Sequence, residues 1–293
     1  MRIDAHQHFW KYQATDYSWI NEQMARLQRD FLPNDLNPLL EKANFDGCIA
    51  VQARQSLEET AFLLDLCLSN PSVLGVVGWV DLQAPDLESR LSAWQQHPGL
   101  LGFRHIVQDE ADPQFLLRPD FIRGVKTLHD YGYTYDILVY EQQLPLVPDF
   151  LARCPDQPFV LDHLGKPVIQ QGVSTRWKEA IRAAAKFPNL YCKVSGLVTE
   201  ANWHQWSAHE FQPFVDEVLE AFGPKRLMVG SDWPVCLLAA EEYADGIQLA
   251  EYLLCQLSVT EQQQVFGQNA AKFYGISDNE EDKKPTIQPE IVS

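Results

Sequence analysis

The sequence has few positive charges for its length. Its 293 residues include 23 Lys and Arg against 40 Asp and Glu, so the formal net charge is -17 at pH 7. Nucleic acids and anionic membrane surfaces attract basic proteins, and this balance argues against both as partners. A highly anionic substrate is disfavoured for the same reason, unless a local basic pocket overrides the field of the whole chain.

Paired cysteines, an apolar leader and long apolar runs are also lacking. The six cysteines are scattered without a CxxC pair, a pattern typical of reduced thiols in a cytoplasmic protein. No charged leader with an apolar core precedes the first strand-like run, and no apolar run is long enough to cross a bilayer. We therefore expect a soluble protein of the cytoplasm.

Short apolar runs alternate with longer amphipathic stretches along most of the chain. The short runs are rich in β-branched and aromatic residues and are bounded by Gly, Pro, Asn or Asp, as is typical of buried strands. Strands are predicted at 3–9, 47–53, 73–82, 101–107, 134–139, 159–164, 190–196 and 227–231. Helices are predicted at 35–43, 58–68, 87–96, 120–131, 142–153, 175–187, 210–222, 241–257 and 260–274.

Eight strands, each followed by a helix, are the number that closes a (β/α)8 TIM barrel, an α/β fold. The competing doubly wound open sheet would want a glycine-rich phosphate turn after an early strand, and the sequence has none. We predict a single barrel over residues 1–276 with extra C-terminal helices. Residues 277–293 are charged and contain proline, and we expect them to be a flexible tail.

Chemically capable side chains lie at the ends of several predicted strands. Active-site groups of such barrels come from the carboxyl ends of the strands. Because side chains alternate along a strand, we expect Asp4, His6 and His8 to share one face. The first and eighth strands are neighbours in a closed barrel, which would bring Asp232 beside the two histidines. Other strand ends carry Arg104, His105, Asp162, His163, Lys193 and Ser195.

These motifs resemble those of the amidohydrolase superfamily. They are Asp4-x-His6-x-His8, Asp162-His163 and Gly230-Ser231-Asp232-Trp233-Pro234. The stretches Gly102-Phe103-Arg104-His105, Leu161-Asp162-His163-x-Gly165-Lys166-Pro167 and Lys193-Val194-Ser195-Gly196-Leu197 are similar to sugar-lactone hydrolases of its amidohydrolase-2 branch, above all those acting on L-fuconolactone. The resemblance extends to about residue 275. It implies a hydrolase that opens a neutral sugar lactone, such as L-fuconolactone, to the sugar acid in L-fucose or related sugar catabolism.

Lactone hydrolysis needs a base for the attacking water and positive or hydrogen-bond-donating groups for the developing oxyanion. Asp232 is the natural base, and it would return the proton to the leaving alkoxide. The catalytic groups that would polarise the carbonyl and keep Asp232 ionised are His6, His8, His163, Arg104 and Lys193.

Other residues are predicted to bind substrate or to support the site. The candidates for reading sugar hydroxyls and the sugar ring are Gln52, Arg54, Trp10, Tyr17, Trp19, Trp79 and His105. Asp4 is expected to orient a histidine, whereas Asp162 should face away from the site because it precedes His163 on a strand. Ser195 lacks the G-x-S-x-G context of a nucleophile.

The resemblance does not by itself decide whether the protein requires a metal ion. Metal-dependent members of the superfamily commonly add a histidine from the fifth strand or a bridging lysine from the fourth. Here the fifth predicted strand has no histidine, and the fourth offers Arg104, a fixed cation that makes a neighbouring metal costly. We therefore expect that no metal is required. A divalent metal such as zinc, if one is bound, would be held by His6, His8 and Asp232, with His163 as a further ligand.

Two other functions compete with lactone hydrolysis. A zinc-dependent decarboxylase of the same superfamily would need a full set of metal ligands, and the missing histidine counts against it. A non-catalytic barrel that binds a sugar acid or a protein partner is disfavoured by the intact set of His6, His8, His163 and Asp232. The sequence does not decide whether the protein forms a homodimer through its extra C-terminal helix.

Overall fold

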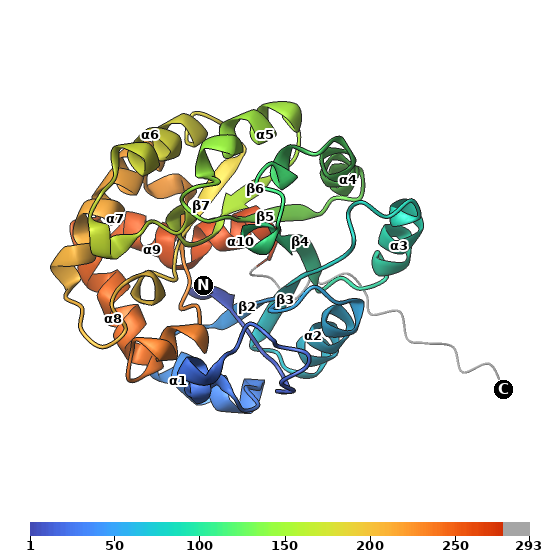
Figure 1. Cartoon of the computed structure of the whole chain (residues 1–293). Coiled ribbons are helices and arrows are strands. Elements are labelled where there is room, and N and C mark those ends of the chain that lie inside the picture. The colour runs from blue at the N-terminus through green and yellow to red at the C-terminus, as the bar shows by residue number, and fades with distance from the viewer. Residues whose placement is uncertain (278–293) are drawn as a thin grey trace.

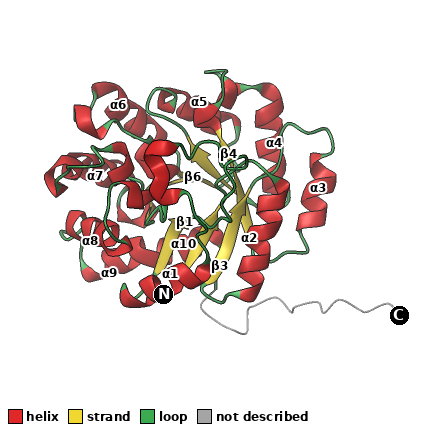
Figure 2. Cartoon of the chain, turned by 60° about the horizontal axis from the view of Figure 1, so that its bottom comes forward, coloured by secondary structure: helices red, strands yellow, loops and turns green. Residues whose placement is uncertain are grey.

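The structure is a computed structural model, and it describes residues 1–277 of the chain. Its centre is a sheet of 8 parallel strands that neighbour one another in the order of the sequence. Figure 1 shows the helices as a ring around these strands, and Figure 2 shows the strands enclosed by them. The strands are β1 (Ile3–Gln7), β2 (Gly47–Val51), β3 (Val73–Gly78), β4 (Leu100–Ile106), β5 (Thr134–Leu138), β6 (Phe159–Leu161), β7 (Leu190–Val194) and β8 (Leu227–Val229).

The helices follow the strands in turn, and more than one follows β8. They are α1 (Pro33–Lys42), α2 (Leu57–Ser69), α3 (Leu87–Trp94), α4 (Pro119–Asp130), α5 (Val147–Arg153), α6 (Thr175–Ala184), α7 (Ala208–Phe222), α8 (Tyr243–Leu253), α9 (Val259–Gln263) and α10 (Asn269–Tyr274). The predicted TIM barrel with extra C-terminal helices is confirmed. In residues 1–277, no helix combines the length and the apolar character that crossing a membrane requires.

The seam between β1 and β8 lies beside the predicted site. The backbone N–H of Asp232 donates to His6 O at 2.8 Å, and the N–H of His8 donates to Trp233 O at 2.7 Å. Asp4 reinforces the seam, because its carboxylate accepts from the N–H of Ser231 at 2.8 Å and from its hydroxyl at 2.6 Å. Closure of the barrel and assembly of the site therefore depend on the same residues.

The apolar residues of the strands are buried on both faces of the sheet, as parallel strands covered by helices require. One cluster fills the barrel interior and includes Ile3, Ala5 and Val160, whereas a larger one lies between the strands and the helices. Ala270 and Tyr274 of α10 belong to the interior cluster. Figure 1 shows α10 across the middle of the ring, so this short helix covers the interior at one end.

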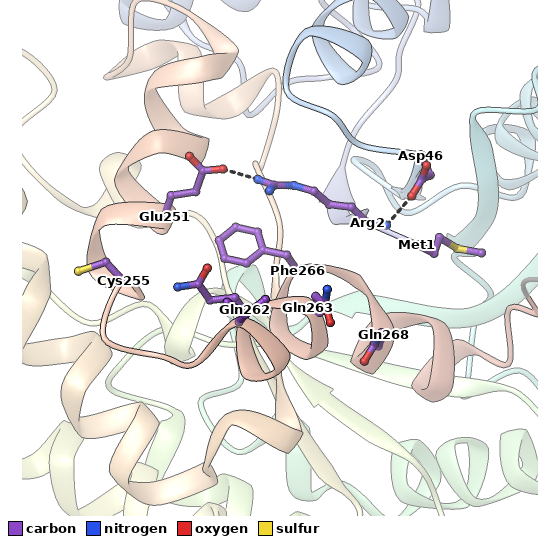
Figure 3. A pocket seen from close by; sticks show the side chains of 10 residues that line it. Met1, Arg2, Asp46, Glu251, Cys255, Gln262, Gln263, Phe266 and Gln268 are labelled. Carbon is purple, nitrogen blue, oxygen red and sulfur yellow. Dashed lines mark hydrogen bonds and ion pairs between the residues drawn. The ribbon is translucent and has the colours of Figure 1, made fainter.

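The amino terminus is fastened at the end of the barrel opposite the predicted site. The backbone N–H of Arg2 donates to Asp46 at 2.6 Å, and its guanidinium lies 2.5 Å from Glu251. The guanidinium also stacks on Phe45 at 4.5 Å and on Phe266 at 4.6 Å. Most of these side chains line a hollow, which Figure 3 shows. This hollow lies before β1 and β2 begin, so it is separate from the carboxyl ends of the strands.

Several predicted boundaries are wrong. β6 ends at Leu161 instead of 164, because the next residues form a tight turn with left-handed backbone angles. The predicted helix 260–274 is divided into α9 and α10 by a π-helical turn at Gln264–Gln268. Within it, Gly267 packs so closely on the amino terminus that an added Cβ would lie 2.2 Å from Met1 O. Apart from Ser277, the predicted tail lies outside the described residues.

Candidate active site

At the carboxyl end of β8, Asp232 is surrounded by three imidazoles from the carboxyl ends of β1 and β6. Its Oδ1 lies 3.3 Å from His8 Nε2, 3.8 Å from His6 Nε2 and 3.9 Å from His163 Nε2. All four side chains are buried, with 5% or less of each exposed. The structure thus brings together the histidines and the carboxylate that the sequence analysis placed at this rim.

A bulge in β1 aims the two histidines of this strand. The register with β2 shifts between Asp4 and Gln7. Ile3 and Ala5 belong to the interior cluster, and His6 points inward as well. Asp4 instead accepts a hydrogen bond from Tyr243 OH of α8 at 3.1 Å, outside the barrel. The prediction that Asp4 shares a face with His6 is therefore wrong, because the bulge interrupts the strict alternation of a strand. Asp4 contacts the backbone N–H of His6 at 3.2 Å.

The imidazoles keep Asp232 ionised. Burial by itself raises the pKa of this carboxyl, but His163, His8 and His6 outweigh it, and the pKa falls well below its ordinary value. Burial lowers the pKa of His163 to about 4 and the pKa of His6 well below 6.5. At neutral pH the site therefore holds a carboxylate beside uncharged rings of His6 and His163.

The turn after β6 places two consecutive residues in the site. His163 and Leu164 have φ angles of 53° and 55°, in the left-handed region. Because this turn ends the alternation of the strand, Asp162 also points inward. Its Oδ2 accepts a hydrogen bond from Arg104 Nη1 at 3.0 Å, and its Oδ1 lies 3.3 Å from His6 Nδ1. The prediction that Asp162 faces away is wrong for this reason. Ser195 contacts His163 Nδ1 through its hydroxyl at 2.9 Å and so holds the ring.

Lys193 lies below His6 in a buried network of charges. Its Nζ is 2.5 Å from Asp136 Oδ2, 3.1 Å from Asp162 Oδ1 and 3.2 Å from His6 Nδ1. Tyr274 OH of α10 donates to Asp136 at 2.9 Å. The sequence analysis missed Asp136, although a charged residue within an apolar strand is a signal that the sequence shows for both Asp136 on β5 and Lys193 on β7. A catalytic role for Lys193 remains a prediction.

Arg104 bridges the network and the imidazoles. Besides Asp162, its Nη1 lies 3.3 Å from His6 Nε2, and its Nη2 donates to Gln52 O. Gln52 in turn donates its side-chain amide to Arg104 O at 3.1 Å, while its buried Oε1 has no hydrogen-bond partner within residues 1–277. Gln52 therefore has one acceptor free beside the site. The adjoining Arg54 reaches the surface, where it pairs with Asp16 at 2.8 Å.

The aromatic candidates Trp10, Tyr17 and Trp19 lie between β1 and α1, and the structure places them in different surroundings. Trp10 is fully buried and packs edge-on against Phe31, and Tyr17 is 3% exposed with its hydroxyl donating to Glu59. Both therefore stabilise the loop as core residues. Trp19 is half-buried and donates to Ala53 O at 3.1 Å, just beyond β2. Substrate contact by these three residues remains a prediction.

Trp79 and His105 lie together on another part of the structure. Trp79 Nε1 donates to His105 Nδ1 at 3.3 Å, and His105 Nε2 lies 2.6 Å from Glu110. The His105 ring stacks on Phe115, with centroids 4.8 Å apart, and meets Phe121 of α4 edge-on. His105 thus points toward the helices while Arg104 points inward, as neighbours on a strand do. The structure does not bring His105 into the group around Asp232.

The donor atoms of the site fit a metal ion. His6, His8 and Asp232 offer ligand atoms that lie within 4.8 Å of one another, as do His6, Asp162 and His163. His8 Nδ1 lies 2.7 Å from Val51 O, so we assign its proton to Nδ1 and a lone pair to Nε2, which faces Asp232. His8 Nε2 lies 3.3 Å from Asp232 Oδ1, so these are the two atoms that would share a bound ion. Since Asp162 offsets the charge of Arg104, the arginine is a weaker obstacle to a metal than the sequence suggested.

Comparison with known proteins places the chain among relatives of nearly equal length. An L-fucono-1,5-lactonase of Burkholderia multivorans is 45% identical over 287 residues, which cover 94% of this chain and 96% of that protein. An L-fucono-1,5-lactonase of Burkholderia ambifaria is 37% identical over 278 residues, with the same coverage.

A crystal structure of an amidohydrolase from Burkholderia multivorans with bound zinc is 46% identical. It superimposes with a TM-score of 0.91 over 94% of this chain and 100% of that one. The family model described as amidohydrolase matches residues 3–276. From its barrel, its cluster of histidines around Asp232 and this match, the chain belongs to the amidohydrolase family.

Proposed function

We propose that this protein hydrolyses a sugar lactone, with L-fucono-1,5-lactone or a close analogue as its substrate. The observation that carries the proposal is the buried Asp232 carboxylate, kept ionised and surrounded by the imidazoles of His6, His8 and His163. The substrate class comes from the two lactonase relatives. A small, neutral lactone also suits a chain with a net charge of -17.

In the proposed mechanism, Asp232 takes a proton from a water molecule as the water oxygen attacks the lactone carbonyl. Arg104 provides positive charge for the oxygen that becomes negative, and the imidazoles of His8 and His163 align the carboxylate. The bond to the ring oxygen then breaks, and Asp232 returns the proton to that oxygen. The products are a hydroxyl and a carboxylic acid on one open chain, and the acid releases its proton to the solvent to become a carboxylate.

A divalent ion would be held by His6, His8 and Asp232, with His163 close enough to join them. When bound, such an ion supplies a Lewis acid for the carbonyl and lowers the pKa of a water molecule. The residues keep their own tasks in either case: Val51 O fixes the tautomer of His8, and Ser195 holds the ring of His163.

The test is an assay of acid release from a panel of aldonolactones, followed with a pH indicator. Asp232→Asn keeps the shape of the side chain but removes the base, and we expect kcat to fall by about 10²- to 10⁴-fold. Asp65→Asn, on the exposed side of α2, is the matched control and should leave kcat unchanged. Undiminished turnover in Asp232→Asn, with the fold intact by circular dichroism, contradicts the mechanism. Absence of turnover of any lactone by the unaltered protein contradicts the proposed function.

A further inference from the structure

Lys166 and Glu200 form a half-buried ion pair next to the Asp232 cluster. Lys166 Nζ lies 3.4 Å from Glu200 Oε1, and the two side chains are 17% and 20% exposed. Lys166 Nζ also lies 5.3 Å from the centre of the Tyr140 ring. The three residues follow β6, β7 and β5, so they lie at the same rim of the barrel as Asp232.

An unusual backbone turn carries Lys166. Its φ angle is 48°, and it follows His163, Leu164 and Gly165, which have φ angles of 53°, 55° and 69°. Left-handed angles in non-glycine residues cost about 1–2 kcal/mol each. Such strain is concentrated at functional sites. The same turn that points His163 toward Asp232 therefore also fixes the direction of Lys166.

The pair has hydrogen-bonding capacity to spare. At 3.4 Å, the Lys166–Glu200 contact is longer than a charge-assisted hydrogen bond of about 2.7–2.9 Å. Among residues 1–277, each of the two has the other as its one polar side-chain partner. An ammonium has three donors and a carboxylate accepts about four hydrogen bonds, so most of this capacity is open to another molecule.

Both charges act on the groups around Asp232. Burial raises the pKa of Glu200, and the negative charge of Asp232 contributes to that rise. Burial also lowers the pKa of His163, and the positive charge of Lys166 contributes to that lowering. The ion pair therefore lies within electrostatic reach of Asp232 and His163.

We propose that Lys166 and Glu200 bind the ring hydroxyls of the lactone, and so make the site selective for polyhydroxylated lactones. Glu200 would accept from one or two hydroxyls while Lys166 donates to a hydroxyl oxygen, and the Tyr140 ring forms the wall beside them. This inference rests on the proposed function, since it assigns the recognition of substituents in the same reaction. It gives a role to the Gly165-Lys166-Pro167 part of a motif from which the mechanism uses only His163.

The test compares two lactones of the same ring size, L-fucono-1,5-lactone and δ-valerolactone, which has no hydroxyls. The readout is the ratio of their kcat/KM values, measured with enough enzyme to follow the slower substrate. We expect the ratio to fall about 10- to 100-fold in Lys166→Met and in Glu200→Gln, because hydrogen bonds to charged groups are lost. Lys166→Arg, which retains a donor, should recover part of the ratio. Lys178→Met, which breaks a pair with Glu217 between α6 and α7, is the control and should leave it unchanged.

The outcomes separate this inference from the proposed function. An unaltered protein that hydrolyses no lactone refutes the function. An unaltered protein that hydrolyses lactones, with the same ratio in all variants, refutes the inference alone. Variants that lose both activities equally also refute it, because the pair would then act on the reaction or the fold instead of on the hydroxyls.

Discussion

Replacement of Lys193 by methionine tests the buried charge network beneath the site. Lys193 is fully buried and is shared by Asp136 and Asp162, at 2.5 Å and 3.1 Å. In Lys193→Met, the two carboxylates lose this cation. Within residues 1–277, Asp162 keeps Arg104 at 3.0 Å, whereas Asp136 keeps no Lys or Arg partner. Removal of one partner from a buried ion pair costs about 3–5 kcal/mol of unfolding free energy, because the other charge is left buried and unpaired.

A second substitution, at Asp136, tests whether the stability is lost because a buried charge is left unpaired. Asp136→Asn in the same chain removes the unpaired charge, and its side chain can still accept from Tyr274 OH. We therefore expect the double variant Asp136→Asn/Lys193→Met to recover at least about half of the lost stability. Lys178→Met, which removes a 45% exposed partner of Glu217, is the control and should cost less than about 1 kcal/mol.

The pH dependence of the loss has a defined sign. Burial raises the pKa of Asp136 from 3.8 to about 6 even with Lys193 beside it. Between these values the folded state holds a proton that the unfolded chain has lost, so the contribution of Asp136 to stability falls as pH rises. Without Lys193 the pKa of Asp136 rises further, so the pH range over which its contribution to stability falls extends to higher pH. The loss in Lys193→Met should therefore be smaller at about pH 5.5 than at about pH 8.

Urea unfolding followed by tryptophan fluorescence measures these differences. With a slope of about 3 kcal/mol per M, the expected loss shifts the midpoint of Lys193→Met by roughly 1–2 M at the higher pH. The reasoning is refuted by a shift below about 0.3 M, by a loss that does not depend on pH, or by a double variant that is less stable than the single one.

Two further predictions concern the residues around Asp232. A chelator-treated protein, shown by elemental analysis to be free of metal, should keep its lactone turnover, because Asp232 supplies the base and Arg104 supplies the positive charge. A loss of turnover that zinc restores would show that the metal is required. Gly196→Ala should lower kcat at least about tenfold, since its Cβ would lie 2.5 Å from His163 Nδ1 and displace that ring. Gly132→Ala imposes the same left-handed strain with no atom within 4 Å, so equal loss of activity in both variants would point to strain instead of displacement.

Local patterns were sufficient for the architecture. The strands of a parallel barrel are buried on both faces and read as short apolar runs, and the count of these runs identified the fold. The rule that active-site groups lie at the carboxyl ends of the strands then selected His6, His8, His163 and Asp232. Each lies where a strand ends, and that position can be read from the sequence without knowledge of any contact across the barrel.

The direction of individual side chains followed local patterns less well. Asp4 and Asp162 were assigned to faces by strict alternation, which fails at the bulge in β1 and at the left-handed turn after β6. Such irregularities depend on packing against other elements, so a short sequence window does not reveal them. The burial of Trp10 against Phe31, which lies in the same segment between β1 and α1, is likewise not visible in a short sequence window.

The sequence by itself determined the barrel, the rim that carries the chemistry and the residue types available there, because strand periodicity and strand ends are local properties. Only the tertiary structure decided which of those residues meet. It paired Lys193 with Asp136 across the barrel interior, Asp4 with Ser231 across the seam, and Lys166 with Glu200 beside Asp232. The energy of a buried charge depends on its partner and its distance to that partner, and both are set by the closing of the barrel.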